Sequence, residues 1–169
     1  MEVIWHSYEL RPLGSPPIPP EYLARIKATE PRLAKIAREN YGIELNRGPM
    51  GIHSRLALIG AKYAEAMGKG PQYHDAMLRA YWQRANNIGL VDVLVEIAQR
   101  VGLGREAFLA ALHNDDYEAQ VEADIEQAYQ YGLTGVPALI FNNRYLVSGA
   151  QPYEVLRQVV EKVEAESSQ

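Results

Sequence analysis

The side chains that carry most enzymatic chemistry are sparse in this chain, which has four histidines and no cysteine. Without a thiol, these residues can form no disulfide, no thiolate metal site and no cysteine nucleophile. Two histidines bind a metal from one helix face when they are spaced i, i+4, and His6, His53, His74 and His113 contain no such pair. The sequence therefore predicts no metal site, and it predicts no cofactor.

Serine and carboxylate side chains offer no clearer catalytic site. The sequence places no histidine and aspartate beside Ser7, Ser15 or Ser54, as a serine nucleophile would require. The acidic run that begins at Asp115 lies where a helix is expected to start, and there its charges favour the helix dipole. We therefore predict no catalytic residue among the side chains of this chain.

Three aromatic residues, Tyr73, Tyr81 and Trp82, lie close together in the sequence and allow two interpretations. They can form core between packed helices, because large aromatic side chains dominate protein interiors. They can also line a substrate groove. Both alternatives stay open at the level of sequence.

A proline stands at the head of an apolar strand, in the segment Thr134-Gly135-Val136-Pro137 that precedes residues 138–141. Proline has no backbone N–H to donate to a neighbouring strand, so a proline at the start of a strand needs a structural explanation. A cis bond would expose the backbone of Val136 as an edge for a ligand, and an X-Pro bond adopts that isomer at low cost. The alternative is a trans proline that starts an edge strand.

Composition excludes several classes of protein. With 47% hydrophobic residues the chain can bury a sizeable core, so disorder is not expected. A net charge of −4 and no basic stripe argue against nucleic acid as a partner. No apolar run approaches the length of a membrane helix, and the first residues do not resemble a secretory signal. A cytoplasmic protein without a membrane or nucleic-acid partner is the expectation.

The elements that must position these residues follow from periodicity and from glycine and proline stops. The alternation in residues 3–10 predicts a strand, and the five prolines of residues 12–20 predict an extended connector. Apolar residues at helical spacing predict six helices. Two short strands around the turn 142–144 are predicted to follow them as a hairpin. A last helix is predicted to begin at Pro152. The six helices are expected at residues 21–41, 54–67, 73–85, 90–101, 105–112 and 117–131. The order predicts an α/β fold with an all-helical insertion.

The segment 134–137, its strand and hairpin, and the later stretch 148–152 (Ser-Gly-Ala-Gln-Pro) resemble the DsbA-like thioredoxin superfamily. The resemblance is to its FrnE-like branch, which is related to 2-hydroxychromene-2-carboxylate isomerases and kappa-class glutathione transferases. Residues 5–12, 54–69 and 81–94 are similar to further parts of the same family. The resemblance implies a thioredoxin-like domain made of residues 1–51 and 117–169, with residues 52–116 as the helical insertion.

The resemblance also implies a binding site, because in that family the proline is cis and the residue before it pairs its backbone with a substrate peptide or glutathione. It carries the substrate-binding role to Thr134, Gly135, Val136 and Pro137. The implied partner is a peptide or protein thiol, or glutathione.

The family's redox motif, Cys-x-x-Cys at the start of a helix that follows an N-terminal strand, has no counterpart in these residues. The sequence resembles an N-terminally incomplete thioredoxin-like fold that begins at the family's second strand, so whether Met1 is the true start is open. The implied activity is thiol–disulfide oxidoreductase, with this chain inactive alone or a truncated gene product. A glutathione-dependent isomerase or transferase, or a non-catalytic peptide-binding protein, are the alternatives. A sheet without its first strand leaves bare edges. We therefore expect either that residues 3–10 pair directly with residues 138–141, or that a partner chain covers the edge, most simply a second copy in a homodimer.

Overall fold

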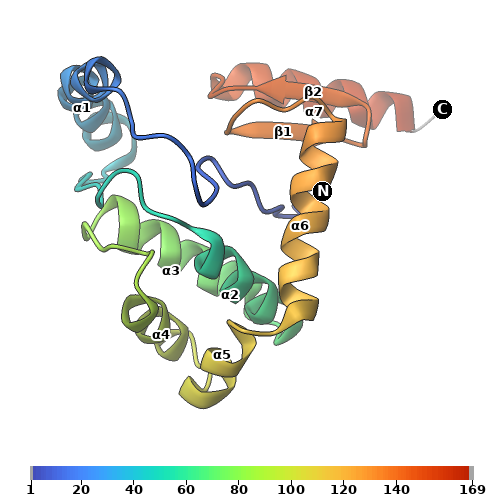
Figure 1. Ribbon diagram of the computed structural model, residues 1–169. Helices are drawn as coiled ribbons and strands as arrows, with labels where there is room; N and C mark the ends of the chain where they lie inside the picture. The colour runs from blue at the N-terminus through green and yellow to red at the C-terminus, as the bar shows by residue number, and fades with distance from the viewer. Residues whose placement is uncertain (1, 168–169) are drawn as a thin grey trace. The chain divides into compact units, whose positions relative to one another are not determined.

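The computed structural model describes residues 2–167 and is mostly helical, with one small two-stranded sheet (Figure 1). The predicted helices are confirmed, and their bounds shift by a few residues at most. No helix within the described part combines the length and apolar character that crossing a membrane requires. In chain order the elements are α1 (Pro20–Tyr41), α2 (Arg55–Ala66), α3 (Gly70–Trp82), α4 (Val91–Arg100), α5 (Arg105–Ala111), α6 (Asp115–Gln130), β1 (Ala138–Phe141), β2 (Tyr145–Ser148) and α7 (Tyr153–Ser167).

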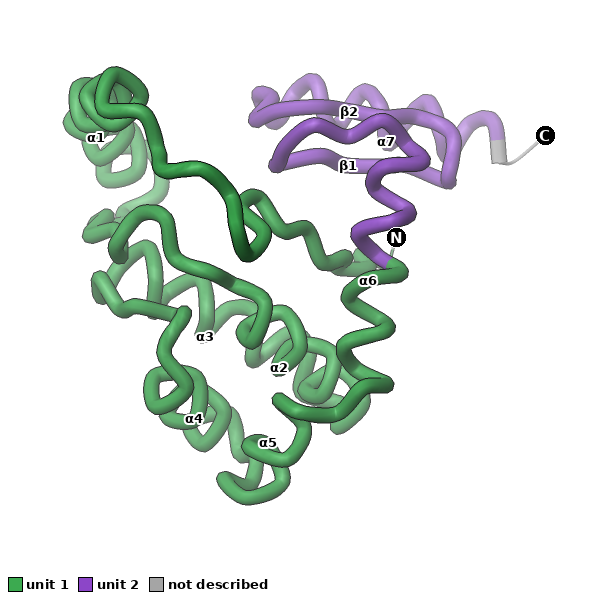
Figure 2. The backbone as a smooth tube through the Cα atoms, in the orientation of Figure 1, with its two compact units in different colours: residues 1–123 green, residues 124–169 purple. Residues whose placement is uncertain are grey.

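The chain divides into two compact units, Met1–Ala123 and Asp124–Gln169, with the division inside α6 (Figure 2). The first unit holds α1 to α5 and the first half of α6, and the second holds the hairpin and α7. These units do not coincide with the predicted pairing of residues 1–51 with 117–169 around an insertion at 52–116. That discontinuous organisation stays a prediction.

The core of the first unit lies around α2, which packs against α3, α4 and α5. Gly60 allows the close approach, because a β-carbon there would lie 2.6 Å from the Tyr73 hydroxyl and 2.8 Å from the Phe108 ring. The Phe108 ring lies 5.9 Å from the ring of Tyr73 and 6.0 Å from that of Tyr63. The largest fully buried side chains all belong to this unit: Tyr73, Phe108, Leu94, Ile97, Val95 and Val121.

Helix α1 begins and ends where proline and glycine signals indicate. Pro20 occupies a first-turn position, where its missing N–H would have no partner in any case. Gly42 follows the helix with φ 65°, in the left-handed region that glycine adopts without steric cost. The amides of Gly42 and Ile43 then donate back to the carbonyls of Arg38 and Ala37, at 3.0 and 3.1 Å, and end the helix.

The predicted strand at residues 3–10 is wrong, because this segment is irregular in the structure. β-Branched and aromatic residues favour a strand only when a neighbouring strand accepts their backbone hydrogen bonds. In the described part of the chain, the sheet contains β1 and β2 alone. Side chains hold the segment instead: Ser7 and Glu9 are buried, and the Trp5 indole stacks on the ring of His74. Val3 and Ile4 remain exposed.

The predicted hairpin of the second unit is confirmed. β1 and β2 are antiparallel, with Ala138 opposite Ser148 and Phe141 opposite Tyr145. Asn142 and Asn143 turn the chain with φ values of 48° and 53°, which asparagine tolerates better than other non-glycine residues. Helix α7 packs against β1. The structure is therefore mostly helical, with a smaller sheet than the α/β fold predicted from the sequence requires.

Candidate functional site

The four predicted substrate-binding residues lie together in one segment between α6 and β1. Gly132, with φ 67°, ends α6 and redirects the chain into this segment. The peptide bond between Val136 and Pro137 is cis, the isomer that the resemblance implies. The Pro137 carbonyl accepts the amide of Gly149 at 2.8 Å, so the hairpin holds the end of the segment. Thr134, Val136 and Pro137 are exposed to solvent.

The backbone of Val136 is available to a ligand. Neither its N–H nor its C=O makes a hydrogen bond with any other residue of the range 2–167. Val136 is followed by Pro137 and then by β1, whose half-buried residues pair with β2 alone among residues 2–167. A strand edge without a partner strand can accept the backbone of another extended segment. The segment can therefore bind a peptide backbone, but its side chains include no nucleophile stronger than the Thr134 hydroxyl.

The hairpin is fixed to the end of α7 by a polar cluster. The Tyr145 hydroxyl donates to the carboxylate of Glu166 at 2.7 Å, and Arg144 pairs with the same carboxylate at 3.3 Å. The ammonium of Lys162 lies 4.7 Å from the centre of the Tyr145 ring, within the range of a cation–π contact. These contacts hold the turn and the first residue of β2 against α7.

The other candidate residues are dispersed. Ser7 is buried, the Ser15 hydroxyl donates to the carbonyl of Pro12 at 2.7 Å, and Ser54 precedes α2. Asp115 and Asp116 lie in the first turn of α6, as the helix-dipole interpretation expects. Within residues 2–167, no group of three or more His, Asp or Glu side chains could hold a metal ion. All of these serines and aspartates belong to the first unit, whereas the 134–137 segment belongs to the second.

Sequence reasoning missed a charged cluster in the first unit. The side chain of Glu9 is only 3% exposed, and Arg55 Nη2 lies 3.2 Å from it and 2.6 Å from the Glu122 carboxylate. Arg55 is the first residue of α2, so the cluster ties the N-terminal segment to α2 and α6. The only signal in the sequence was the acidic residue in an otherwise apolar stretch, which does not by itself reveal burial.

The three aromatic residues do not form one group in the structure, and a substrate groove at Tyr81 and Trp82 stays a prediction. Tyr73 is buried core, and burial raises the pKa of its hydroxyl. Tyr81 and Trp82 instead lie at the end of α3 with their rings in edge-to-face contact at 5.2 Å. Both are accessible to solvent.

His74 gives the first unit an expected pH dependence. Burial holds the pKa of His74 below its usual range, against the opposing effect of Asp75 and Glu65, and its Nε2 atom has no partner among residues 2–167. The unfolded chain therefore binds a proton more readily than the folded chain, so stability falls as the pH drops below about 6.5. We expect His74→Gln to make urea unfolding less sensitive to pH between about 7.5 and 5.5.

The control for this prediction is His113→Gln, which removes an exposed histidine outside the Trp5–His74 stack. Unfolding followed by tryptophan fluorescence at the two pH values measures both variants. Equal pH dependence in the wild type and in His74→Gln would contradict the assignment.

The chain is similar in sequence to two known proteins. Over 163 residues the chain is 28% identical to the uncharacterized protein YwbO of Bacillus subtilis (strain 168). The matched region covers 95% of this chain and 81% of YwbO. It is 28% identical over 124 residues to the thiol:disulfide interchange protein DsbA of Azotobacter vinelandii, covering 72% of this chain and 56% of that protein. The chain thus spans little more than half the length of that DsbA.

Two solved structures share the fold. A probable DsbA oxidoreductase from Streptomyces coelicolor superposes with a TM-score of 0.79 at 26% identity, covering 95% of this chain and 74% of that one. A 2-hydroxychromene-2-carboxylate isomerase superposes with a TM-score of 0.75 at 19% identity, covering 92% and 76%. The model of the DSBA-like thioredoxin domain matches residues 1–161. Since this match includes nearly the whole sequence, the chain belongs to the family of DSBA-like thioredoxin domains.

Proposed function

We propose that this chain binds an extended peptide carrying a cysteine thiol or disulfide, and that its own 169 residues supply no thiol. The observation that carries the proposal is the exposed backbone of Val136 at the entrance to β1. A peptide that pairs with a strand edge gains main-chain hydrogen bonds without needing a particular side chain. The thiol substrate follows from family membership and from relatives named as thiol:disulfide interchange proteins.

The chemistry of a complete thiol–disulfide exchange needs a thiolate, which attacks one sulfur of a disulfide and releases the other. No side chain of this sequence can provide it, so the proposed role of these residues is to bind the substrate. In an oxidoreductase that contains them, the attacking thiol lies outside these 169 residues. The predicted homodimer is part of this proposal, because the outer edge of β1 can accept a second copy as well as a peptide.

A glutathione-dependent isomerase or transferase is the second candidate. The observation that favours it is the fold shared with a 2-hydroxychromene-2-carboxylate isomerase. Glutathione is itself a short peptide with a thiol, so the same segment would bind it through the same backbone groups. The ligands of the two candidate functions differ: glutathione is shorter than an extended peptide and carries free carboxylates.

The test uses an acetylated and amidated pentapeptide of alanines with S-methylcysteine at its centre, which cannot oxidise. We expect saturable shifts of the amide resonances of Gly135 and Val136, since these residues would pair with the peptide. Two N-methylated peptides, one methylated on odd and one on even residues, test backbone pairing directly. Alternate amides of a strand point to opposite sides, so only one of the two methylated peptides loses the amides that pair with the protein. That peptide is expected to bind at least tenfold more weakly, and the other peptide to bind normally.

Val136→Asp is expected to weaken peptide binding about tenfold, because the new charge would lose solvent beside the bound strand. Leu146→Asp is the matched control, since Val136 is 49% and Leu146 48% exposed and Leu146 lies on β2. Glutathione binding without pentapeptide binding would overturn the first candidate in favour of the second. Faster reduction of insulin by dithiothreitol in the presence of this chain would contradict the absence of an attacking thiol.

A further inference from the structure

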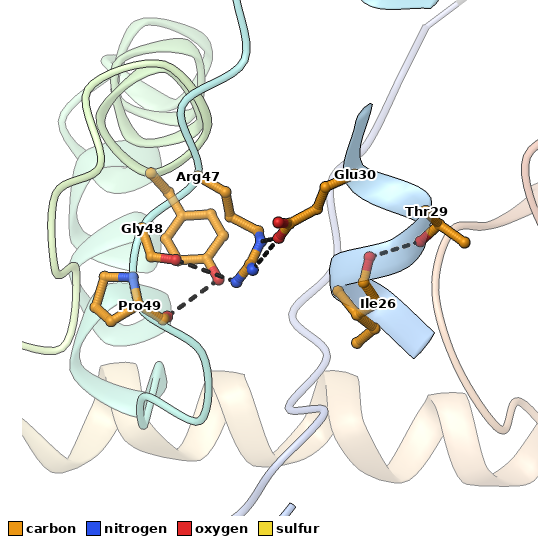
Figure 3. A network of polar contacts seen from close by, with 7 residues as sticks. Ile26, Thr29, Glu30, Arg47, Gly48 and Pro49 are labelled. Atoms are coloured by element: carbon orange, nitrogen blue, oxygen red, sulfur yellow. Dashed lines mark hydrogen bonds and ion pairs between the residues drawn. The ribbon is translucent and has the colours of Figure 1, made fainter. Parts of the chain in front are cut away.

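Polar side chains fix loops to neighbouring elements in both units. In the first unit, Arg47 of the loop of residues 42–54 donates through Nε and Nη2 to the carboxylate of Glu30 on α1 (Figure 3). Its Nη1 donates to the carbonyl of Gly48 at 3.2 Å. The two charges compensate each other, so this network holds the loop against α1. A smaller contact of the same kind lies in the second unit, next to the 134–137 segment.

Residues 148–152 join the end of β2 to the start of α7 in the second unit. Gly149 has φ 77°, in the left-handed region that glycine adopts without steric cost, and it turns the chain out of the strand. The carbonyl of Pro152 accepts the amide of Val155 at 3.0 Å in the first turn of α7. Gln151 therefore stands between two fixed points, the end of the hairpin and the start of a helix.

The end of the hairpin where the 134–137 segment enters is weakly tied. In an antiparallel ladder, the two residues of a hydrogen-bonded pair exchange two N–H···O=C bonds. The register of β1 and β2 places Pro137 opposite Gly149, and the Gly149 amide donates to the Pro137 carbonyl at 2.8 Å. Proline has no N–H to donate back to the Gly149 carbonyl. A single hydrogen bond therefore joins these two residues, where other residue types would form two.

Gln151 supports that hydrogen bond from the other side of the same peptide group. The Ser148 carbonyl and the Gly149 N–H belong to one planar unit, here called the 148–149 peptide unit. Its carbonyl accepts a hydrogen bond from Nε2 of Gln151 at 2.9 Å, while its N–H donates to Pro137. Each hydrogen bond in such a chain polarises the next. Rotation of the unit would break both hydrogen bonds, so its N–H stays directed at the Pro137 carbonyl.

We propose that Gln151 is a positioning residue for the 134–137 segment and acts through the 148–149 peptide unit. With that unit fixed, the Pro137 carbonyl is held, and the adjoining backbone of Val136 keeps the geometry that pairs with a peptide strand. The inference rests on the proposed function of this segment. A segment that is ordered before the ligand arrives binds more tightly than one that must be ordered by it. Because Gln151 is exposed to solvent, its removal affects affinity rather than the stability of the fold.

Gln151→Met tests the positioning without any ligand, because methionine keeps the length of the side chain and removes its hydrogen-bond donor. Exchange of the Gly149 amide with water, measured by NMR, is expected to become about threefold faster or more, since the bond to Pro137 loses its support. The Val147 amide on β2 is the internal reference and should not change. Gln158→Met, at an exposed glutamine on α7, is the matched control. Unchanged exchange at Gly149, or the same change in Gln158→Met, would overturn the proposal.

The pentapeptide with S-methylcysteine measures the consequence for binding. Gln151→Met is expected to weaken it about three- to tenfold and Gln158→Met to leave it unchanged, with equal urea midpoints for both variants. Gln151→Lys, whose ammonium can donate to the same carbonyl, is expected to restore most of the affinity.

The two measurements separate this role from the proposed function. Faster exchange at Gly149 with unchanged peptide affinity would overturn the link between Gln151 and the 134–137 segment. No recovery in Gln151→Lys would overturn the hydrogen bond as the cause. If the wild type does not bind the pentapeptide, the proposed function fails, and the exchange at Gly149 alone decides whether Gln151 holds the end of the hairpin.

Discussion

Replacement of Phe108 by alanine is expected to lower the free energy of unfolding by about 3–5 kcal/mol, the largest effect of any single substitution considered for this chain. The side chain is fully buried on α5. Its ring lies against those of Tyr63 and Tyr73, and Gly60 brings α2 close enough to seal the contact. Alanine would remove the ring and leave a cavity that the surrounding helices cannot close, because packed cores relax only in part.

Two substitutions serve as controls for this prediction. Phe108→Leu keeps most of the volume and is expected to cost less than about 1.5–2 kcal/mol. Tyr153→Ala removes an aromatic side chain that is largely exposed at the start of α7 and should change stability by less than about 0.5 kcal/mol. Urea unfolding followed by circular dichroism measures all three variants. A loss below about 1 kcal/mol in Phe108→Ala would show that α5 does not pack in the core as described.

Arg55→Met is expected to lower the free energy of unfolding by about 2–3 kcal/mol. The substitution keeps an apolar stem of similar length but leaves the buried Glu9 carboxylate without its cation. Removal of one partner from a buried pair usually costs about 3–5 kcal/mol, and we expect less because the Arg55 side chain is 28% exposed.

The double variant Arg55→Met/Glu9→Gln isolates the charge effect. A neutral amide at position 9 is expected to recover part of the stability that Arg55→Met loses, because no uncompensated charge remains. Arg100→Met, which breaks an exposed pair with Glu96 on α4, is the control and should cost no more than about 0.5 kcal/mol. If Arg55→Met and Arg100→Met cost the same, Glu9 is not held in a buried pair.

The elements that the sequence predicted well are those that local interactions define. Helix α1 ends at Gly42 because glycine enters the left-handed region there, and this preference belongs to the residue itself. The hairpin turns at Asn142 and Asn143 for a similar reason, since both adopt positive φ. The four residues of the 134–137 segment adjoin in sequence and therefore in space, and their substrate-binding role stays a prediction.

What failed or was missed depends on partners that are distant in sequence. Residues 3–10 have the composition of a strand, but a strand needs a neighbour to accept its hydrogen bonds, and the sheet contains only β1 and β2. The burial of Glu9 depends on Arg55 and Glu122, which lie far along the chain. Neither periodicity nor composition reports such contacts.

The sequence by itself determined the helices, the hairpin and the absence of a thiol in these 169 residues. Each of these follows from residue type, from local backbone preference or from a contiguous motif. The tertiary structure alone decided that the loop of residues 42–54 is tied to α1 through Arg47 and Glu30, and that the N-terminal segment is held by an ion pair and a ring stack. The physical reason is that side chains from separate elements meet only after the helices pack, and the energy of that packing is set by buried surface and paired charge.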